Sequence, residues 1–98
     1  GEAADPAIRT SVRHLADEDD AVSNVGRILT VHMGPNTLVL NMDLEFSDGL
    51  STGEVESAVD RLERGVRELH PEVKYVFIEA RSIARRAQGG AATASATA

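Results

Sequence analysis

The 98-residue sequence contains no cysteine, no tryptophan and only three other aromatic residues. Without cysteine the chain cannot form disulfides or thiolate metal sites, which excludes metal chaperoning through paired cysteines. Basic residues are also few, because ten Lys and Arg stand against sixteen Asp and Glu, giving a net charge of −6. Such a chain lacks the positive field and the stacking side chains that nucleic-acid binding requires. We therefore expect no nucleic-acid partner.

Long apolar runs are missing as well. No stretch approaches the roughly 20 apolar residues that cross a bilayer, and no signal-peptide pattern is present, so we expect a soluble piece. The length allows one domain, which we place at residues 1–86. Residues 87–98, AQGGAATASATA, contain no large apolar side chain and are predicted to be a disordered tail. A domain this small has a marginal core, so a partner would add buried area.

Two amphipathic helices are expected. The first begins at Asp5-Pro6, which pairs an N-cap residue with proline at the first helical position, and it runs up to the acidic segment 16–20. That segment, ADEDD, is interpreted as a flexible solvated loop, although a divalent cation could also neutralise it. The second helix begins behind a capping box formed by Ser51 and Glu54 and ends at His70-Pro71.

Three strands are expected at residues 22–33, 37–46 and 73–79, the first two joined by a Gly-Pro-Asn turn. The element order is therefore α-β-β-α-β. The crossover helix should pack on the same face of the sheet as the first helix, following the right-handed connection rule.

The first two strands carry apolar residues on both faces. If Met33 pairs with Thr37, Ile28 lies opposite Met42, and Arg27 lies opposite Asp43 as a cross-strand ion pair. One layer of helices covers only one face, so apolar residues on the other face predict a partner surface. The residues predicted to form this interface are Leu29, Val31, Met33 and Val39.

Four segments in a fixed order carry a resemblance: V-S-N-V-G-R-I-L-T-V-H-M-G, L-V-L-N-M-D-L-E-F, S-T-G-E-V and V-K-Y-V-F-I-E-A. From residue 2 to about residue 82 the sequence resembles the cytoplasmic C-terminal domain of cation diffusion facilitator (CDF) transporters. The resemblance implies an α+β, two-layer, ferredoxin-like or metallochaperone-like fold with a three-stranded sheet. It also implies a homodimer attached to the transmembrane domain of the same transporter, on the cytoplasmic side of the bacterial inner membrane.

The implied function is dimerisation and regulation of a divalent metal cation/proton antiporter that exports zinc or a similar transition metal. Many relatives bind metal at the dimer interface. They often have histidines at the positions of Gly26 and Glu79 and a carboxylate at that of Arg81, so the resemblance implies a weak or absent interfacial site here. The weak candidates for a remaining Zn2+ or Mn2+ site, drawn from both chains, are His32, His70, Asp43 and Glu79.

Each histidine also has a plain structural interpretation. Zinc sites need three or four ligands, and no HxH or HxxxH spacing is present. His14 reads as an exposed helical residue, His70 as a helix C-cap, and His32 as a hydrogen-bonded residue at the rim of the sheet.

The sequence also bears on two other classes of function. A small-molecule-sensing regulatory α/β module remains the alternative, although only Gly49 and Gly53 lie near a helix N-terminus. No Ser-His-Asp or paired-acid constellation is present, so we expect no enzyme. The cluster of Arg81, Arg85 and Arg86 could contact an anion or a lipid headgroup, while a solvated face is its ordinary interpretation.

Overall fold

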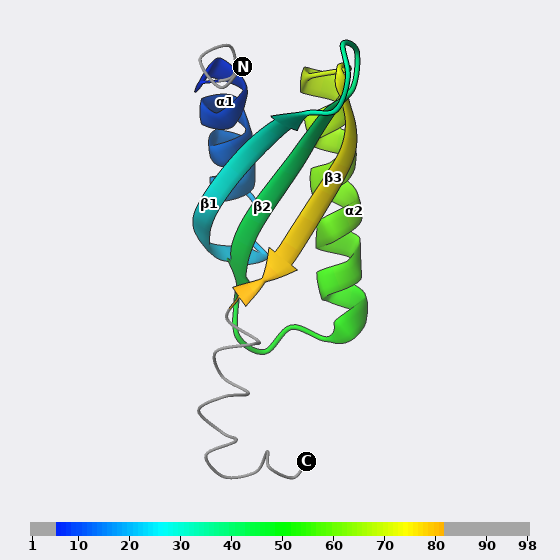
Figure 1. Ribbon diagram of the computed structural model, residues 1–98. Coiled ribbons are helices and arrows are strands. Elements are labelled where there is room, and N and C mark those ends of the chain that lie inside the picture. The colour runs from blue at the N-terminus through cyan, green and yellow to red at the C-terminus, as the bar shows by residue number, and fades with distance from the viewer. Residues whose placement is uncertain (1–5, 82–98) are drawn as a thin grey trace, which may run out of the picture.

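The computed structural model describes residues 6–81 (Figure 1). The sheet has the strand order β1-β2-β3, with β1 antiparallel and β3 parallel to β2. The predicted α-β-β-α-β order and three-stranded sheet are confirmed. In chain order the elements are α1 (Pro6–Asp17), β1 (Val22–His32), β2 (Leu38–Phe46), α2 (Thr52–Leu69) and β3 (Val73–Ala80).

Some predictions fall on residues outside this range. The N-cap at residue 5 and the tail at 87–98 both lie outside the described residues. The division of the chain at residue 86 therefore stays a prediction.

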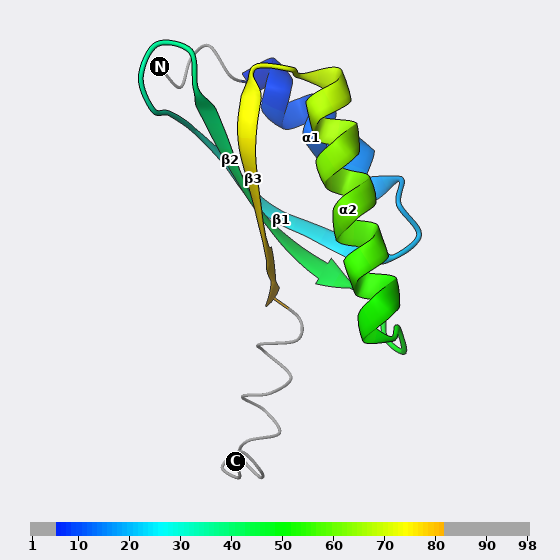
Figure 2. The ribbon, with the colours of Figure 1, turned by 90° about the vertical axis from the view of Figure 1, so that its right-hand side faces the viewer.

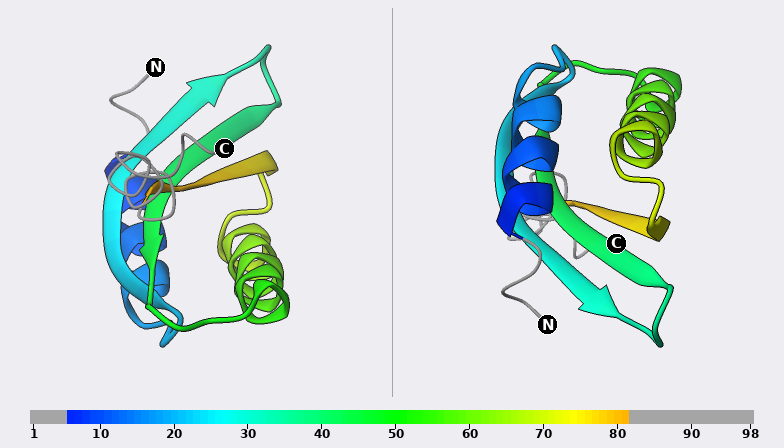
Figure 3. Two further views of the ribbon diagram at one scale, coloured as in Figure 1. Left: turned by 90° about the horizontal axis from the view of Figure 1, so that it is seen from below. Right: turned by 90° about the horizontal axis from the view of Figure 1, so that it is seen from above.

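Both helices lie on the same face of the sheet, as the connection rule predicts (Figures 2 and 3). The core fills the space between the two layers. Strand β2 contributes alternate residues to it because successive side chains of a strand point to opposite faces. The largest fully buried side chains are Leu40, Met42, Leu44, Leu62, Val12, Val66 and Val73. Each such aliphatic side chain contributes roughly 1.5–3 kcal/mol through burial.

Helix α2 begins at the predicted capping box. The backbone N–H of Glu54 donates to Oγ of Ser51 at 3.1 Å, and the backbone N–H of Ser51 donates to Oε1 of Glu54 at 2.8 Å. The helix ends at His70, whose backbone N–H donates to the carbonyl oxygen of Val66 at 2.8 Å. Both ends are therefore satisfied by the chain itself.

Strands β1 and β2 pair in the predicted register from residue 28 onward, with Ile28 opposite Met42. The predicted pairing of Arg27 with Asp43 is wrong. A β-bulge intervenes, so that Gly26 and Arg27 both lie between the Val25–Leu44 and Ile28–Met42 pairs. Asp43 forms its ion pair with Arg81 instead.

The bulge is held by α1. The guanidinium of Arg13 donates to the carbonyl oxygen of Val25 at 3.1 Å and to that of Gly26 at 2.8 Å. A bulge leaves ladder groups unpaired, and Arg13 satisfies two of them. Glycine suits the bulge sterically, because a Cβ atom at position 26 would lie 3.1 Å from the Cβ atom of Asp43.

The acidic loop after α1 is not simply a flexible solvated segment. Asp19 accepts two hydrogen bonds from the guanidinium of Arg61 on α2, at 2.8 and 2.9 Å, and one from the backbone N–H of Ala21 at 3.0 Å. This bidentate contact lowers the pKa of Asp19 below its ordinary value of 3.8. The expectation of a solvated loop is wrong for Asp19, which ties the loop to the second helix.

Candidate functional site

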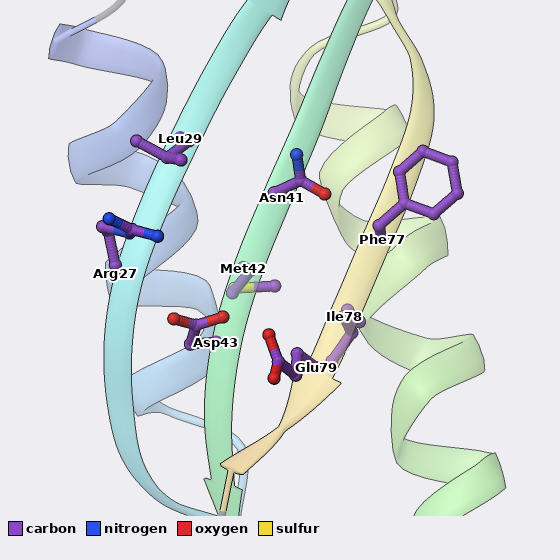
Figure 4. A pocket seen from close by; sticks show the side chains of 8 residues that line it. All are labelled: Arg27, Leu29, Asn41, Met42, Asp43, Phe77, Ile78 and Glu79. Carbon is purple, nitrogen blue, oxygen red and sulfur yellow. The ribbon is translucent and has the colours of Figure 1, made fainter.

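The sheet face opposite the helices carries three rows of side chains that run across the strands. The strand registers define these rows, and Figure 4 shows the two lower ones on the face turned toward the viewer. Starting from the hairpin turn, the rows are Val31–Val39–Tyr75, then Leu29–Asn41–Phe77, and then Asp43–Glu79 opposite the bulge.

The two rows nearest the hairpin expose large apolar side chains. Leu29 and Val31 are 42% and 44% exposed, Tyr75 and Phe77 are 56% and 57% exposed, and Met33 at the end of the hairpin is 60% exposed. Single exposed apolar residues are ordinary, whereas a contiguous group marks an interaction surface. We call this group the open-face patch, and it consists of Leu29, Val31, Met33, Val39, Tyr75 and Phe77.

All four residues predicted for the interface belong to the open-face patch. The predicted interface left out Tyr75 and Phe77, which alternate with Val76 and Ile78 along the third strand. What was missing was the position of β3 in the sheet. Because β3 lies directly beside β2, Tyr75 falls next to Val39 and Phe77 next to Asn41.

A depression of about 410 Å³ joins the apolar rows to the charged row (Figure 4). Its wall includes Leu29 and Phe77 at one end and Arg27, Asp43 and Glu79 at the other. It therefore offers apolar contact beside charges of both signs, and it is shallow and open to the solvent side of the sheet.

Asp43 and Glu79 lie side by side on β2 and β3. The side chain of Asp43 is only 17% exposed, and its Oδ2 atom lies 3.2 Å from Nη1 of Arg81. Of the four predicted metal ligands, these two carboxylates are brought together by the fold.

The predicted histidine ligands lie elsewhere. His32 lies opposite Leu38 at the hairpin end of β1. Its side chain is on the same side of the sheet as the two helices. Asp43 lies five positions along β2 from Leu38, about 16 Å at the rise of an extended chain. His32 and Asp43 therefore stand far apart and on opposite faces, and they do not share a site within one chain.

His70 is engaged in a structural contact. It is the C-cap of α2, and its Nε2 atom is hydrogen-bonded to Oγ of Ser11 on α1. The Ser11 hydroxyl also donates to the carbonyl oxygen of Ile8 at 3.1 Å. The capping role predicted for His70 is confirmed, and the contact also ties the two helices together.

His14 lies where it was expected. Its side chain is 76% exposed, and its Nε2 atom is 4.0 Å from a carboxylate oxygen of Glu18. It contributes nothing to the open sheet face.

No family model matches the sequence, and no curated protein matches it. Among solved structures, a zinc form of a MamM C-terminal-domain variant aligns with a TM-score of 0.69 and 10% identity, covering 81% of this chain and 86% of that one. A manganese form of another variant gives 0.65 and 11%, covering 76% and 92%. A copper form of the MamM domain gives 0.69 and 10%, covering 79% and 74%.

The chain has the fold of the MamM C-terminal domain. MamM is a member of the cation diffusion facilitator family, so the resemblance found in the sequence is confirmed at the level of the fold. The zinc, manganese and copper forms are properties of MamM. At 10–11% identity they leave the ligands of the present chain to be judged from its own residues.

Those residues fit a metal ion poorly. Within residues 6–81, no group of three or more His, Cys, Asp or Glu side chains is arranged to hold one. Of the two carboxylates that do come together, Asp43 is already paired with Arg81. A ligand set drawn from two chains stays a prediction. Over the same residues, no helix is both long and apolar enough to cross a membrane.

Proposed function

We propose that this chain is the cytoplasmic dimerisation and regulatory domain of a divalent metal cation/proton antiporter of the cation diffusion facilitator family, and that it has no enzymatic role. The open-face patch is the observation that supports the proposal most directly. A two-layer fold whose sheet leaves such a patch exposed is incomplete without a partner. The likeness to the MamM domain supports the choice of family.

A second copy of the chain fits the patch best. Twofold symmetry requires a surface to match itself. The open face meets this requirement because its apolar rows lie beside a charged region that contains both signs, Arg27 and Arg81 with Asp43 and Glu79. Tyr75 and Phe77 are of the residue types enriched in the cores of protein interfaces.

In a transporter, such a dimer would hold two membrane halves at a defined spacing. A ligand regulates transport only if it binds two arrangements of the dimer unequally. The membrane half would select the exported ion, zinc or a similar transition metal. The domain described here would set how the two halves are held.

The oligomeric state of the purified chain tests the proposal. We expect a dimer at tens of micromolar, a concentration ordinary for a moderate interface. Leu29→Asp or Val31→Asp should give a monomer, because each puts a charge into the apolar rows. The matched control is Leu69→Asp, since Leu69 is 52% exposed but lies on α2, away from the sheet face. Sedimentation velocity would separate the two states, and circular dichroism would show that each variant is folded.

Two results would contradict dimerisation through this face. One is a wild-type chain that sediments as a monomer at about 100 μM, where most specific complexes form. The other is loss of the dimer in Leu69→Asp with no change in Leu29→Asp.

The alternative of a small-molecule-sensing module has one observation in its favour, the depression of about 410 Å³ beside charges of both signs. The N-terminus of α2 argues against it. That helix end is closed by Ser51 and Glu54, so its N–H groups are in part already occupied. We retain the dimerisation domain as the function.

A further inference from the structure

Asp43 already has a cationic partner within its own chain. It lies on the central strand, and its side chain is only 17% exposed although it stands on the uncovered face of the sheet. A carboxylate with little access to water is costly unless a positive charge or hydrogen bonds compensate it. Arg81 supplies that charge, with Nη1 at 3.2 Å from Oδ2 of Asp43.

Glu79 brings a second negative charge to the same place. It is the register partner of Asp43 on β3, and Figure 4 shows both carboxylates on the open face. Neighbouring strands are only about 5 Å apart, so two like charges side by side repel each other. The planar guanidinium of Arg81 carries five N–H donors, enough to serve two carboxylates.

A divalent cation would meet two obstacles at this place. Zinc sites use three or more protein ligands, whereas the fold brings only Asp43 and Glu79 together here, and no larger ligand group occurs in the described part of the chain. The second obstacle is positive charge. Arg81 is paired with Asp43, and Arg27 lines the same depression as Asp43 and Glu79.

We propose that the guanidinium of Arg81 is a built-in cation. It takes the place beside Asp43 that a divalent metal shared by Asp43 and Glu79 would otherwise occupy, and it keeps the open face competent to assemble without metal. The inference rests on the proposed function, in which the open face is the dimer interface. Its regulatory consequence is that assembly responds to ionic strength, which screens the arginine–carboxylate attraction, and does not require a metal ion.

Isothermal titration of the full chain with zinc chloride tests the inference. The wild-type chain should show no binding tighter than about 100 μM. Arg81→Asp removes the guanidinium and adds a third carboxylate, so it should bind zinc at least about tenfold more tightly. The matched control is Arg64→Asp, which makes the same change of charge at an exposed position on α2 and should behave like the wild type. Adding Asp43→Asn to Arg81→Asp should abolish the gain.

Two results would overturn it. In the first, the wild-type chain binds zinc at micromolar concentration and loses that binding in Asp43→Asn, which means that metal displaces the arginine. In the second, Arg81→Asp binds no better than Arg64→Asp. If Arg81→Asp fails to fold, Arg81→Gln provides the same comparison, with a smaller gain expected because it adds no ligand.

Sedimentation separates this inference from the proposed function. We expect the wild-type dimer to be unchanged by EDTA or by equimolar zinc and to weaken as sodium chloride is raised. A chain that is monomeric under every condition contradicts the proposed function, and the titrations still decide the role of Arg81. A dimer that forms only with zinc contradicts the built-in cation alone.

Discussion

The two faces of the same sheet differ in how far their side chains are buried. On the helix-covered face, alternate residues of β2 are at most 4% exposed. On the other face, the same strand presents Val39, Asn41, Asp43 and Glu45, all of them partly accessible. One strand therefore stabilises the fold with one set of side chains and offers a surface with the other. The comparison predicts that substitutions on the two faces will affect different measurements.

The largest expected effect lies on the covered face. Leu40 is fully buried, and Leu40→Ala should lower the free energy of unfolding by about 2–5 kcal/mol because it leaves a cavity. The matched substitution is Leu29→Ala on the open face. At a concentration where the chain is monomeric, it should change that free energy by less than about 1 kcal/mol. Urea unfolding followed by circular dichroism measures both. Equal losses would show that the open face also supports the monomer.

An intermediate loss of stability is expected at the bulge, where the alternation of side chains along β1 is interrupted. Arg13→Met keeps the aliphatic stem but removes the donors to the carbonyl oxygens of Val25 and Gly26. We expect a loss of about 1 kcal/mol, typical of hydrogen bonds that leave their acceptors partly accessible. Amide hydrogen exchange should also become faster around residue 26.

Arg67→Met provides the control, since Arg67 is exposed in the last turn of α2. A similar loss in both variants would mean that Arg13 acts through general surface charge. Unchanged exchange at the bulge would contradict its role as the partner of those carbonyls.

The smallest expected effect concerns pH. The hydrogen bonds from Arg61 lower the pKa of Asp19 in the folded chain, so the ionised carboxylate stabilises the fold above its ordinary value of 3.8. That contribution is lost as the pH falls through the lowered value. Asp19→Asn should therefore be slightly less stable than the wild type at neutral pH, and the difference should shrink in acid. The guanidinium of Arg61 is half exposed, so the effect is modest.

Urea midpoints at several pH values would test this, with Asp17→Asn as the control because Asp17 is exposed beside the same loop. A difference between Asp19→Asn and the wild type that grows as the pH falls would refute the assignment.

Much of the fold was predictable because its signals are local. The capping box at Ser51 needs only residues three positions apart, and the hairpin register follows from a turn and from alternation along β2. Four residues of the open-face patch followed from the same alternation. The dimer that they predict stays a prediction.

The bulge shows where local reasoning ends. Val25 and Ile28 are both buried although they are three residues apart, and a regular strand would place them on opposite faces. Only the extra residue at Gly26–Arg27 allows both to face the helices, and it moves Arg27 out of register with Asp43. Nothing in the hydrophobic pattern alone distinguishes this from a straight strand with an ion pair.

The sequence by itself determined the element order, the ends of α2 and the existence of an apolar surface without a cover, because these depend on neighbours in the chain. The tertiary structure decided which polar side chains from distant parts of the sequence meet. It placed Arg81 against Asp43, Arg61 against Asp19 and Ser11 against His70, pairs separated by 38, 42 and 59 positions in the sequence. Such contacts depend on how β3 lies beside β2 and how α2 lies beside α1. For the same reason His32 and His70 lie apart from the two carboxylates. Arg81 is the partner of Asp43, one of the predicted metal ligands.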